Sequence, residues 1–271
     1  MAATLPDLAT IGLSRGASNG AALRIVLDRP DRMNAWDKQL GSDLLAAIEL
    51  AAADPGIRAV TITGAGRAFS SGADLRAGFD PRPDGRPDVG SALRERYHPI
   101  ITGVRRMPKP VLAAVNGPAV GIGCSLALAC DLVAAPESAY LLLAFVNIGL
   151  VPDGGSSVFV PARAGAGRAA TMAMLGERVP AAQANAWGLV DVVTSDDSFA
   201  AEVDALEERL ATGPTRSYAA SKAQLNARVY ANLDEQLELE ASLQQEMAGS
   251  GDFAEGVTAF LERRAPRFAG Q

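Results

Sequence analysis

Short β-rich runs alternate with helical patterns through the first half of the chain, and this alternation limits the possible folds more than any other feature. A helical spacing of apolar residues fills 37–54, and a second helical pattern fills 121–130. Four further runs have the apolar, β-branched character of strands, at 21–30, 57–64, 109–117 and 130–136. Strands that alternate with helices in this way predict an α/β core with much parallel pairing.

The character of the sequence changes at Phe199, after which only helical patterns occur, at 199–212, 215–230, 233–249 and 252–265. Isolated helices are marginal in water, so these must pack on the core or on another subunit. We therefore divide the chain into a core, 1–198, and an all-helical C-terminal region, 199–271. Within the core, 76–90 is rich in Pro, Gly and charge, which predicts an exposed loop.

Composition excludes several classes of partner. The chain has 48% hydrophobic and 21% charged residues with a net charge of −6, which is typical of a soluble globular protein and argues against nucleic acid or an anionic membrane as the main partner. No apolar run is long enough to span a bilayer, and the first ten residues lack a basic start followed by an apolar run. We therefore expect a cytoplasmic protein without a signal peptide.

The few cysteines and histidines restrict the chemistry. Cys124 and Cys130 lie in one apolar segment and would point to different sides of a helix, so we expect core thiols rather than a disulfide or a metal pair. His98 is the single histidine, in a polar, proline-flanked stretch that indicates a loop or a helix edge. A histidine-based triad would have to use it, and zinc bound by several histidines is impossible. No metal site is predicted.

Two glycine-rich turns, 64–75 and 116–126, follow predicted strands. Both resemble dinucleotide fingerprints, but the third glycine is replaced by Phe69 and Leu126, which argues against a Rossmann cofactor. Glycines let the backbone approach a ligand closely, so two such loops facing one point could offer two N–H donors to one oxygen, as an oxyanion hole does. The alternative is that both turns merely connect strand to helix.

The two glycine loops together resemble a known family. "AFSSGADL" and "KPVLAAVNGPAVGIGCSLALACDLVAA" are similar to the two signature segments of the crotonase family, the enoyl-CoA hydratase/isomerase superfamily. Further family segments match in the expected order, as "LDRPDRMNAW", "GLVPDGGSS", "ANAWGLVDVV" and "DFAEGVTAFLERR". The resemblance covers nearly the whole chain, and the combination of segments is much more specific than any one of them.

The resemblance implies a crotonase-like spiral of ββα repeats with an all-helical C-terminal region that serves oligomerisation. It also implies a homotrimer, often paired into a hexamer, and an acyl-CoA thioester as substrate in fatty acid metabolism. Coenzyme A would be part of the substrate, and no other cofactor is expected.

The resemblance further implies a set of site residues. The thioester oxygen would lie between the backbone N–H groups of Ala73 and Ile122, the latter replacing a glycine often found there. Asp74 is expected to cap a helix that begins in "GADL". The resemblance places Arg263 near the coenzyme A phosphates and Phe260 in the same site, and the alternative for Arg263 is a solvated charge on the surface. The implied substrate-binding residues are Arg32, Met33, Asn34, Ser70, Gly72, Asp74, Leu75, Gly121, Ser125, Phe145, Phe260 and Arg263.

The carboxylates decide which reaction is possible. Hydratases of the family use two glutamates that bracket a water, and the matching residues here are Ser125 and Phe145, neither of which can exchange a proton as a carboxylate does. Asp153 in "VPDGG" matches the single acid of the peroxisomal-type Δ3,Δ2-enoyl-CoA isomerases and of the ring-opening isomerase of bacterial phenylacetate degradation. An apolar wall that includes Phe145, Leu141 and Leu143 would raise its pKa. The alternative for Asp153 is a turn residue or a helix cap.

The leading hypothesis is therefore an enoyl-CoA isomerase that shifts a double bond from C3 to C2 through an enolate, with Asp153 as the proton carrier. One alternative is a lyase-type enoyl-CoA hydratase, or a thioester hydrolase, that uses a water placed by Asp153 and Ser125. Another is a non-catalytic family member that binds acyl-CoA. Asp131, at a predicted helix-to-strand junction, is interpreted as structural.

Overall fold

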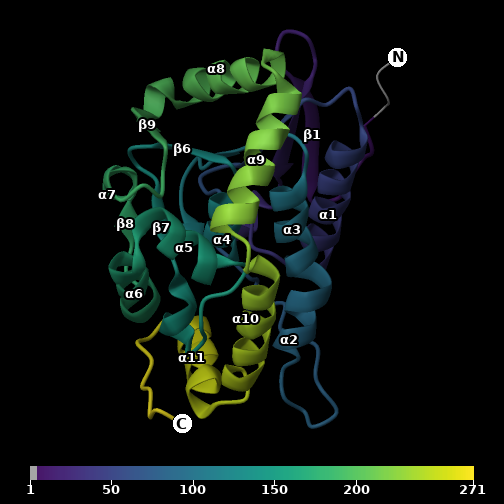
Figure 1. Ribbon diagram of the computed structural model, residues 1–271. Coiled ribbons are helices and arrows are strands. Elements are labelled where there is room, and N and C mark those ends of the chain that lie inside the picture. Colours follow the sequence, from purple (N-terminus) through teal and green to yellow (C-terminus); the bar gives the residue numbers. More distant parts are fainter. Residues whose placement is uncertain (1–4) are drawn as a thin grey trace.

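A six-stranded sheet forms the centre of the computed structural model, which describes residues 5–271 and so leaves the first four residues of the N-terminal stretch outside it (Figure 1). The strand order is β1-β2-β3-β4-β6-β9, with β1 antiparallel to β2 and all other neighbours parallel. The strands are β1 (Ile11–Gly16), β2 (Ala22–Leu27), β3 (Ala59–Gly64), β4 (Val111–Ala114), β6 (Leu132–Pro136) and β9 (Val192–Thr194). The predicted parallel α/β core is confirmed, and β1 and β9 extend it at both edges.

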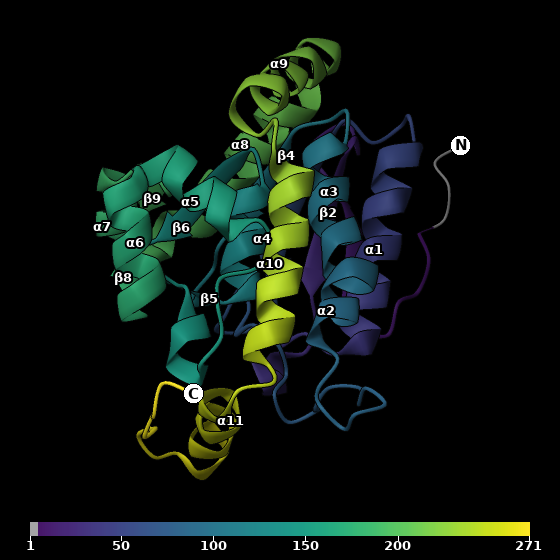
Figure 2. The same cartoon turned by 60° about the horizontal axis from the view of Figure 1, so that its bottom comes forward.

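Helices cover both faces of this sheet. α1 (Lys38–Ala53) packs on β1 and β2 and lies beside α3 (His98–Arg106), while α8 (Phe199–Thr212) packs on β2, β3 and β6 (Figures 1 and 2). Successive strand side chains point to opposite faces, so Leu23, Ile25 and Leu27 of β2 join the core under α1, whereas Ala22 and Arg24 face α8. The alanines on the α8 side, which come from four strands, are Ala22, Ala59, Ala114 and Ala134.

The predicted ββα repeats are confirmed. In the first, β4 is followed by β5 (Ala119–Val120) and α4 (Ile122–Ala129). In the second, β6 is followed by β7 (Tyr140–Leu142), a 3₁₀ turn at Ala144–Ile148 and α5 (Ser156–Ala164). A second sheet of order β5-β7-β8 results, completed by β8 (Val179–Pro180). α6 (Ala166–Leu175) and α7 (Ala181–Ala186) lie beside it in Figure 2.

The C-terminal helices begin and end close to the predicted positions. After α8 come α9 (Thr215–Val229), α10 (Leu233–Met247) and α11 (Gly251–Glu262). α10 packs on α2 (Val89–Ala92) and α5, whereas α11 packs on the 3₁₀ turn that follows β7 (Figure 2). The predicted loop is also confirmed: 76–88 is irregular, and α2 begins directly after it.

The cysteines have the predicted environment, whereas the histidine lies inside a continuous helical run, 89–106, and not in a loop. Cys124 and Cys130 are unpaired and fully buried, and burial raises the pKa of each thiol to about 12, so neither is a reactive thiolate. His98 is the first residue of α3, and burial lowers its pKa to about 4. Among residues 5–271 no helix is both long and apolar enough to cross a membrane, and no cluster of metal-ligating side chains occurs.

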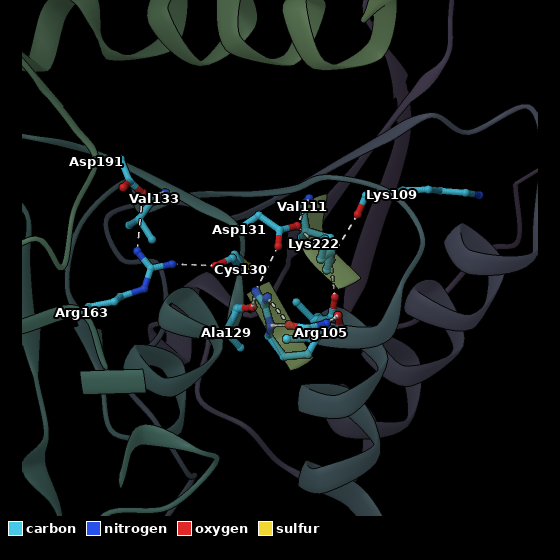
Figure 3. A network of polar contacts seen from close by, with 12 residues as sticks. Arg105, Lys109, Val111, Ala129, Cys130, Asp131, Val133, Arg163, Asp191 and Lys222 are labelled. Carbon is cyan, nitrogen blue, oxygen red and sulfur yellow. Dashed lines mark hydrogen bonds and ion pairs between the residues drawn. The ribbon is translucent and has the colours of Figure 1, made fainter. Parts of the chain in front are cut away.

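Asp131 holds three elements together at the junction of α4 and β6 (Figure 3). Its carboxylate accepts hydrogen bonds from Arg105 Nη1 on α3 (3.0 Å) and from the backbone N–H of Val111 (2.9 Å), and it pairs with Lys222 Nζ on α9 (2.8 Å). The Arg105 and Lys222 side chains are only 4% and 5% exposed, so each cation depends on this carboxylate for its counter-charge. The structural interpretation of Asp131 is confirmed.

Substitution of Asp131 therefore tests what fixes α9 to the core. Asp131→Asn leaves two buried cations without a counter-charge, and we expect the free energy of unfolding to fall by about 3 kcal/mol in urea denaturation. Asp234→Asn is a matched control, because Asp234 of α10 forms an exposed ion pair with Arg106, the neighbour of Arg105 on α3. Equal losses in the two variants would contradict the structural role of Asp131.

Candidate active site

The two glycine loops lie against each other in the structure. The backbone N–H of Val120 donates to the carbonyl of Ser70 (2.9 Å), in an isolated bridge between Ser70 and Ala119. Gly72 and Gly121 have φ of +91° and +54°, and a Cβ placed on Gly72 would lie 3.1 Å from the Val120 carbonyl oxygen and 3.7 Å from the Gly121 Cα. A side chain at Gly72 would press on the second loop, and the positive φ of both residues favours glycine.

Each glycine is followed by a backbone N–H that is free of protein acceptors. Trp36 donates to the Gly72 carbonyl (2.8 Å) and accepts from the Asp74 N–H (2.9 Å), which leaves the Ala73 N–H pointing away from that pairing. Ile122 is the first residue of α4, where N–H groups have no partner within the helix. Within residues 5–271, neither N–H donates a hydrogen bond. The loops thus bring two unpaired donors close to each other.

Asp153 lies beside the second glycine loop. It precedes Gly154 and Gly155, and a Cβ placed on Gly154 would lie 2.4 Å from Ile122 Cδ1 and 2.9 Å from Ser125 Cβ. α5 begins at Ser156 without a side-chain cap, and it is the Asp153 backbone carbonyl that accepts from the Ser156 N–H (3.2 Å). The alternative interpretation of the Asp153 side chain as a helix cap is therefore wrong.

Asp153 is 6% exposed, and the two oxygens of its carboxyl group differ in their partners. Oδ2 accepts a hydrogen bond from Gln244 Nε2 on α10 (2.9 Å). Oδ1 is buried and has no partner among residues 5–271. A second acid of α10, Glu240, lies one helical turn from Gln244 and accepts from the N–H groups of Gly155 (2.8 Å) and Ser157 (3.0 Å).

These surroundings raise the pKa of Asp153 well above its ordinary value. Burial has the largest effect, the negative charge of Glu240 adds to it, and the hydrogen bond from Gln244 acts in the opposite direction. Burial also raises the pKa of Glu240. Burial, and then the charge of Asp153, raise the pKa of Tyr97, so its phenol stays neutral beside the acid. A carboxyl with a raised pKa can both accept and return a proton near neutral pH.

Ser125 and Phe145, which replace the two glutamates of the family's hydratases, make contacts within the protein. The Ser125 hydroxyl is fully buried and donates to the Asp153 backbone carbonyl (2.7 Å). Phe145 is buried beside Gly121, since its ring lies 3.9 Å from a Cβ placed on that glycine. Ser125 thus fixes the loop that carries Asp153, and Phe145 closes the site on its apolar side.

Asn34 and Ser70 shape the segment that was predicted to contact coenzyme A. The Asn34 side chain is fully buried and donates to the carbonyls of Ala65 (2.9 Å) and Ala68 (2.8 Å). The Ser70 hydroxyl is also buried and donates to the Asn34 carbonyl (2.9 Å). That coenzyme A lies along Asn34 and Ser70 stays a prediction, and the polar side-chain atoms of both residues are hydrogen-bonded within the chain. Ligand contact through the partly exposed Met33 and the exposed Arg32 stays a prediction.

Asp74 differs from expectation, whereas the ligand contacts of the α11 residues stay predictions. No helix begins in "GADL"; Asp74 instead accepts from the Arg76 N–H in a turn (3.2 Å) and from Arg29 Nη2 (3.2 Å), so the predicted helix cap is wrong. The Ala73 N–H is nevertheless unpaired, as that prediction required. Phe260 is 54% exposed and Arg263 is exposed at the end of α11. Within residues 5–271, no side-chain hydrogen bond or ion pair joins Arg263 to the site.

Gln244, Glu240 and Tyr97 were missed by the sequence analysis. The first two carried a signal, because they occupy the face of α10 on which Leu237 and Ala241 are buried, where a polar residue needs a partner. Tyr97 ends a π-helical turn, Leu93–Tyr97, and packs edge-on against Trp36 with ring centroids 5.3 Å apart. Nothing in the local sequence indicates the π turn.

Comparison with known proteins agrees with the geometry of the glycine loops. The family model described as enoyl-CoA hydratase/isomerase matches residues 17–271. The chain is 38% identical to 1,2-epoxyphenylacetyl-CoA isomerase of Escherichia coli, over 92% of this chain and 95% of that one. It is 42% identical to a protein of Rhodobacter capsulatus named probable enoyl-CoA hydratase, over 94% and 96%.

A solved structure shares the whole fold. An enoyl-CoA hydratase from Mycobacterium avium subsp. paratuberculosis superimposes with a TM-score of 0.87 at 40% identity, and the match covers 97% of this chain and all of the other. The family match spans every strand of the sheet except β1, both glycine loops, the Asp153 loop and the C-terminal helices. The chain is therefore an enzyme of the enoyl-CoA hydratase/isomerase family, the crotonase superfamily.

Proposed function

We propose that this acyl-CoA-binding enzyme is an enoyl-CoA isomerase that moves a double bond from C3 to C2, with Asp153 as its proton carrier. The observation that carries the proposal is one buried carboxyl with a free oxygen, on a loop packed against Ile122 and near two unpaired backbone donors. The reaction requires these two functions, a group that exchanges one proton and a site that holds negative charge.

The proposed reaction has two proton transfers. The thioester oxygen accepts hydrogen bonds from the Ala73 and Ile122 N–H groups, and each such donor is worth about 3 kcal/mol in the transition state. Asp153 takes a proton from C2, so that a C–H bond breaks, an O–H bond forms, and the charge moves to the thioester oxygen as an enolate. The same carboxyl then gives a proton to C4 while the C2–C3 double bond forms, which restores ionised Asp153.

Two observations favour isomerisation over hydration. The hydratase reaction of this family uses two carboxylates around a water, but here the Ser125 hydroxyl is bound to the Asp153 backbone and Phe145 is apolar. The other acid near Asp153, Glu240, is occupied by two backbone N–H groups. The name of the Escherichia coli relative, an isomerase of a CoA thioester, supports the same reaction class.

We further propose that the protein assembles as a homotrimer, alone or paired as a hexamer. Leu239 (48% exposed) and Leu243 (39%) of α10 line a mainly apolar hollow of about 290 Å³ together with Ala169, Ala170 and Ala173 of α6. Two further apolar side chains at the end of α6 are exposed, Met174 (73%) and Leu175 (59%). Exposed apolar clusters of this kind mark protein–protein contacts.

The assay of isomerisation tests the proposal directly. With a 3-enoyl-CoA substrate, Asp153→Ala and Asp153→Asn should each lower kcat by about 10³-fold or more, because neither side chain exchanges a proton as a carboxyl does. Asp234→Asn, an exposed acid of α10, should keep the wild-type rate. Full activity in the Asp153 variants would remove its proposed role, and hydration of crotonyl-CoA without isomerisation would favour the hydratase.

The raised pKa of Asp153 also predicts a stability effect. Its folded-state pKa lies above its unfolded value, so the native protein loses stability as the pH rises from about 4 to the folded-state pKa, where the buried carboxyl ionises. Asp153→Asn cannot ionise, and its midpoint of thermal unfolding relative to wild type should rise over this range and then stay constant. A relative midpoint that falls with pH would contradict the raised pKa.

The proposed assembly can be tested by a charge in the apolar cluster. Leu239→Glu places a carboxylate where a neighbouring copy would exclude water, so we expect the variant to be monomeric by light scattering while its circular dichroism stays native. A wild-type protein that is itself monomeric at micromolar concentration would refute the trimer.

A further inference from the structure

Two side chains of α10, one helical turn apart, form hydrogen bonds with the Asp153 loop. Gln244 Nε2 donates to the Val151 carbonyl (2.6 Å) on one side of Asp153 and to Asp153 Oδ2 itself (2.9 Å). Glu240 accepts from two N–H groups on the other side, those of Gly155 and Ser157. Gln244 is fully buried and Glu240 is 3% exposed, so these contacts are shielded from water.

The orientation of the Gln244 amide is fixed by its surroundings. The Val151 carbonyl can only accept a hydrogen bond, so the amide nitrogen, and not the oxygen, must face it. The same nitrogen supplies its other N–H to Asp153 Oδ2. Gln244 Oε1 is buried and has no partner among residues 5–271. Asp153 Oδ2 therefore accepts a hydrogen bond from the Gln244 amide and cannot donate one to it.

The two oxygens of Asp153 consequently have different capacities. A proton on Oδ2 would place an O–H against the N–H of Gln244, which costs the hydrogen bond. A proton on Oδ1 leaves that bond intact, and Oδ1 has no protein partner that would hold it away from a substrate. The carboxyl thus has one anchored oxygen and one that is free to react.

We propose that Gln244 is a positioning residue that anchors Oδ2 of Asp153 and leaves Oδ1 as the single oxygen that exchanges the proton with the substrate. The inference rests on the proposed isomerase function. In the first step the C2–H bond breaks and the Oδ1–H bond forms; in the second the Oδ1–H bond breaks and the C4–H bond forms. Gln244 neither gains nor loses a proton in either step.

Two other titratable groups face Asp153, and neither replaces Gln244. Glu240 comes from α10 and raises the pKa of Asp153 by its charge, but its oxygens are held by backbone N–H groups. Tyr97 comes from the π-helical turn and stays neutral, because burial and the charge of Asp153 raise its pKa. Gln244 stabilises the ionised form and lowers the pKa of Asp153 against these effects.

Gln244→Met tests the inference, since it keeps the length of the side chain and removes the donor. The variant loses the hydrogen bond that the Gln244 N–H donates to the Asp153 carboxylate. The rising limb of the kcat–pH profile should therefore move to higher pH by about one unit. A carboxyl no longer held in orientation should lower kcat at pH 7 by about 10- to 100-fold, with KM for the 3-enoyl-CoA nearly unchanged. Gln244→Glu, which replaces the donor by an acceptor of the same shape, should move the limb in the same direction.

Gln245→Met is the matched control. The neighbouring Gln245 side chain donates a hydrogen bond to the Pro87 carbonyl and accepts one from the Gly90 N–H, away from Asp153. This variant should therefore keep the wild-type kcat–pH profile. If Gln244 had only a structural role, its substitution would lower the fraction of active enzyme equally at every pH. The rising limb of the kcat–pH profile would then stay in place. An unshifted limb in folded Gln244→Met or Gln244→Glu would overturn the inference, whereas an active Asp153→Asn would overturn the proposed function itself.

Discussion

The site depends on a carboxyl group that the fold removes from water without giving it a full set of partners. Burial disfavours the charged form of Asp153, and the nearby charge of Glu240 disfavours it further. Backbone contacts fix the position of the residue, since the hydroxyls of Ser125 and Ser156 donate to its carbonyl (2.7 and 2.8 Å). The carboxyl itself has one hydrogen bond, from Gln244 to Oδ2, and Oδ1 has no partner among residues 5–271.

The proposed charge-holding half of the site is made of backbone and tolerates side-chain change. Gly72 and Gly121 allow the loops to touch, and the donors belong to the residues that follow them. Ile122 can therefore replace a glycine without loss of its N–H, and its side chain packs against Gly154 instead. The ββα repeat that ends in α4 supplies both the second donor and, through Ser125, the support for Asp153.

Sequence patterns predicted what is local and periodic. The four C-terminal helices and the parallel strands followed from apolar spacing, and the glycine loops were found because each follows a strand. Interactions between distant segments were not predictable: Gln244 lies 91 positions from Asp153, and only the folding of α10 across α5 brings them together. Asp74 was assigned to a helix that does not form, because its side chain makes an equally ordinary turn and an ion pair with Arg29.

The most direct test of the account follows one hydrogen from C2 to C4. A 3-enoyl-CoA carrying deuterium at C2 is converted in ordinary water, and the product is analysed by mass spectrometry and NMR. If one buried oxygen carries the deuterium without contact with bulk water, a substantial fraction of it should appear at C4 of the product. Complete replacement by hydrogen from the solvent, from the first turnover onward, would contradict a shielded proton carrier at Asp153.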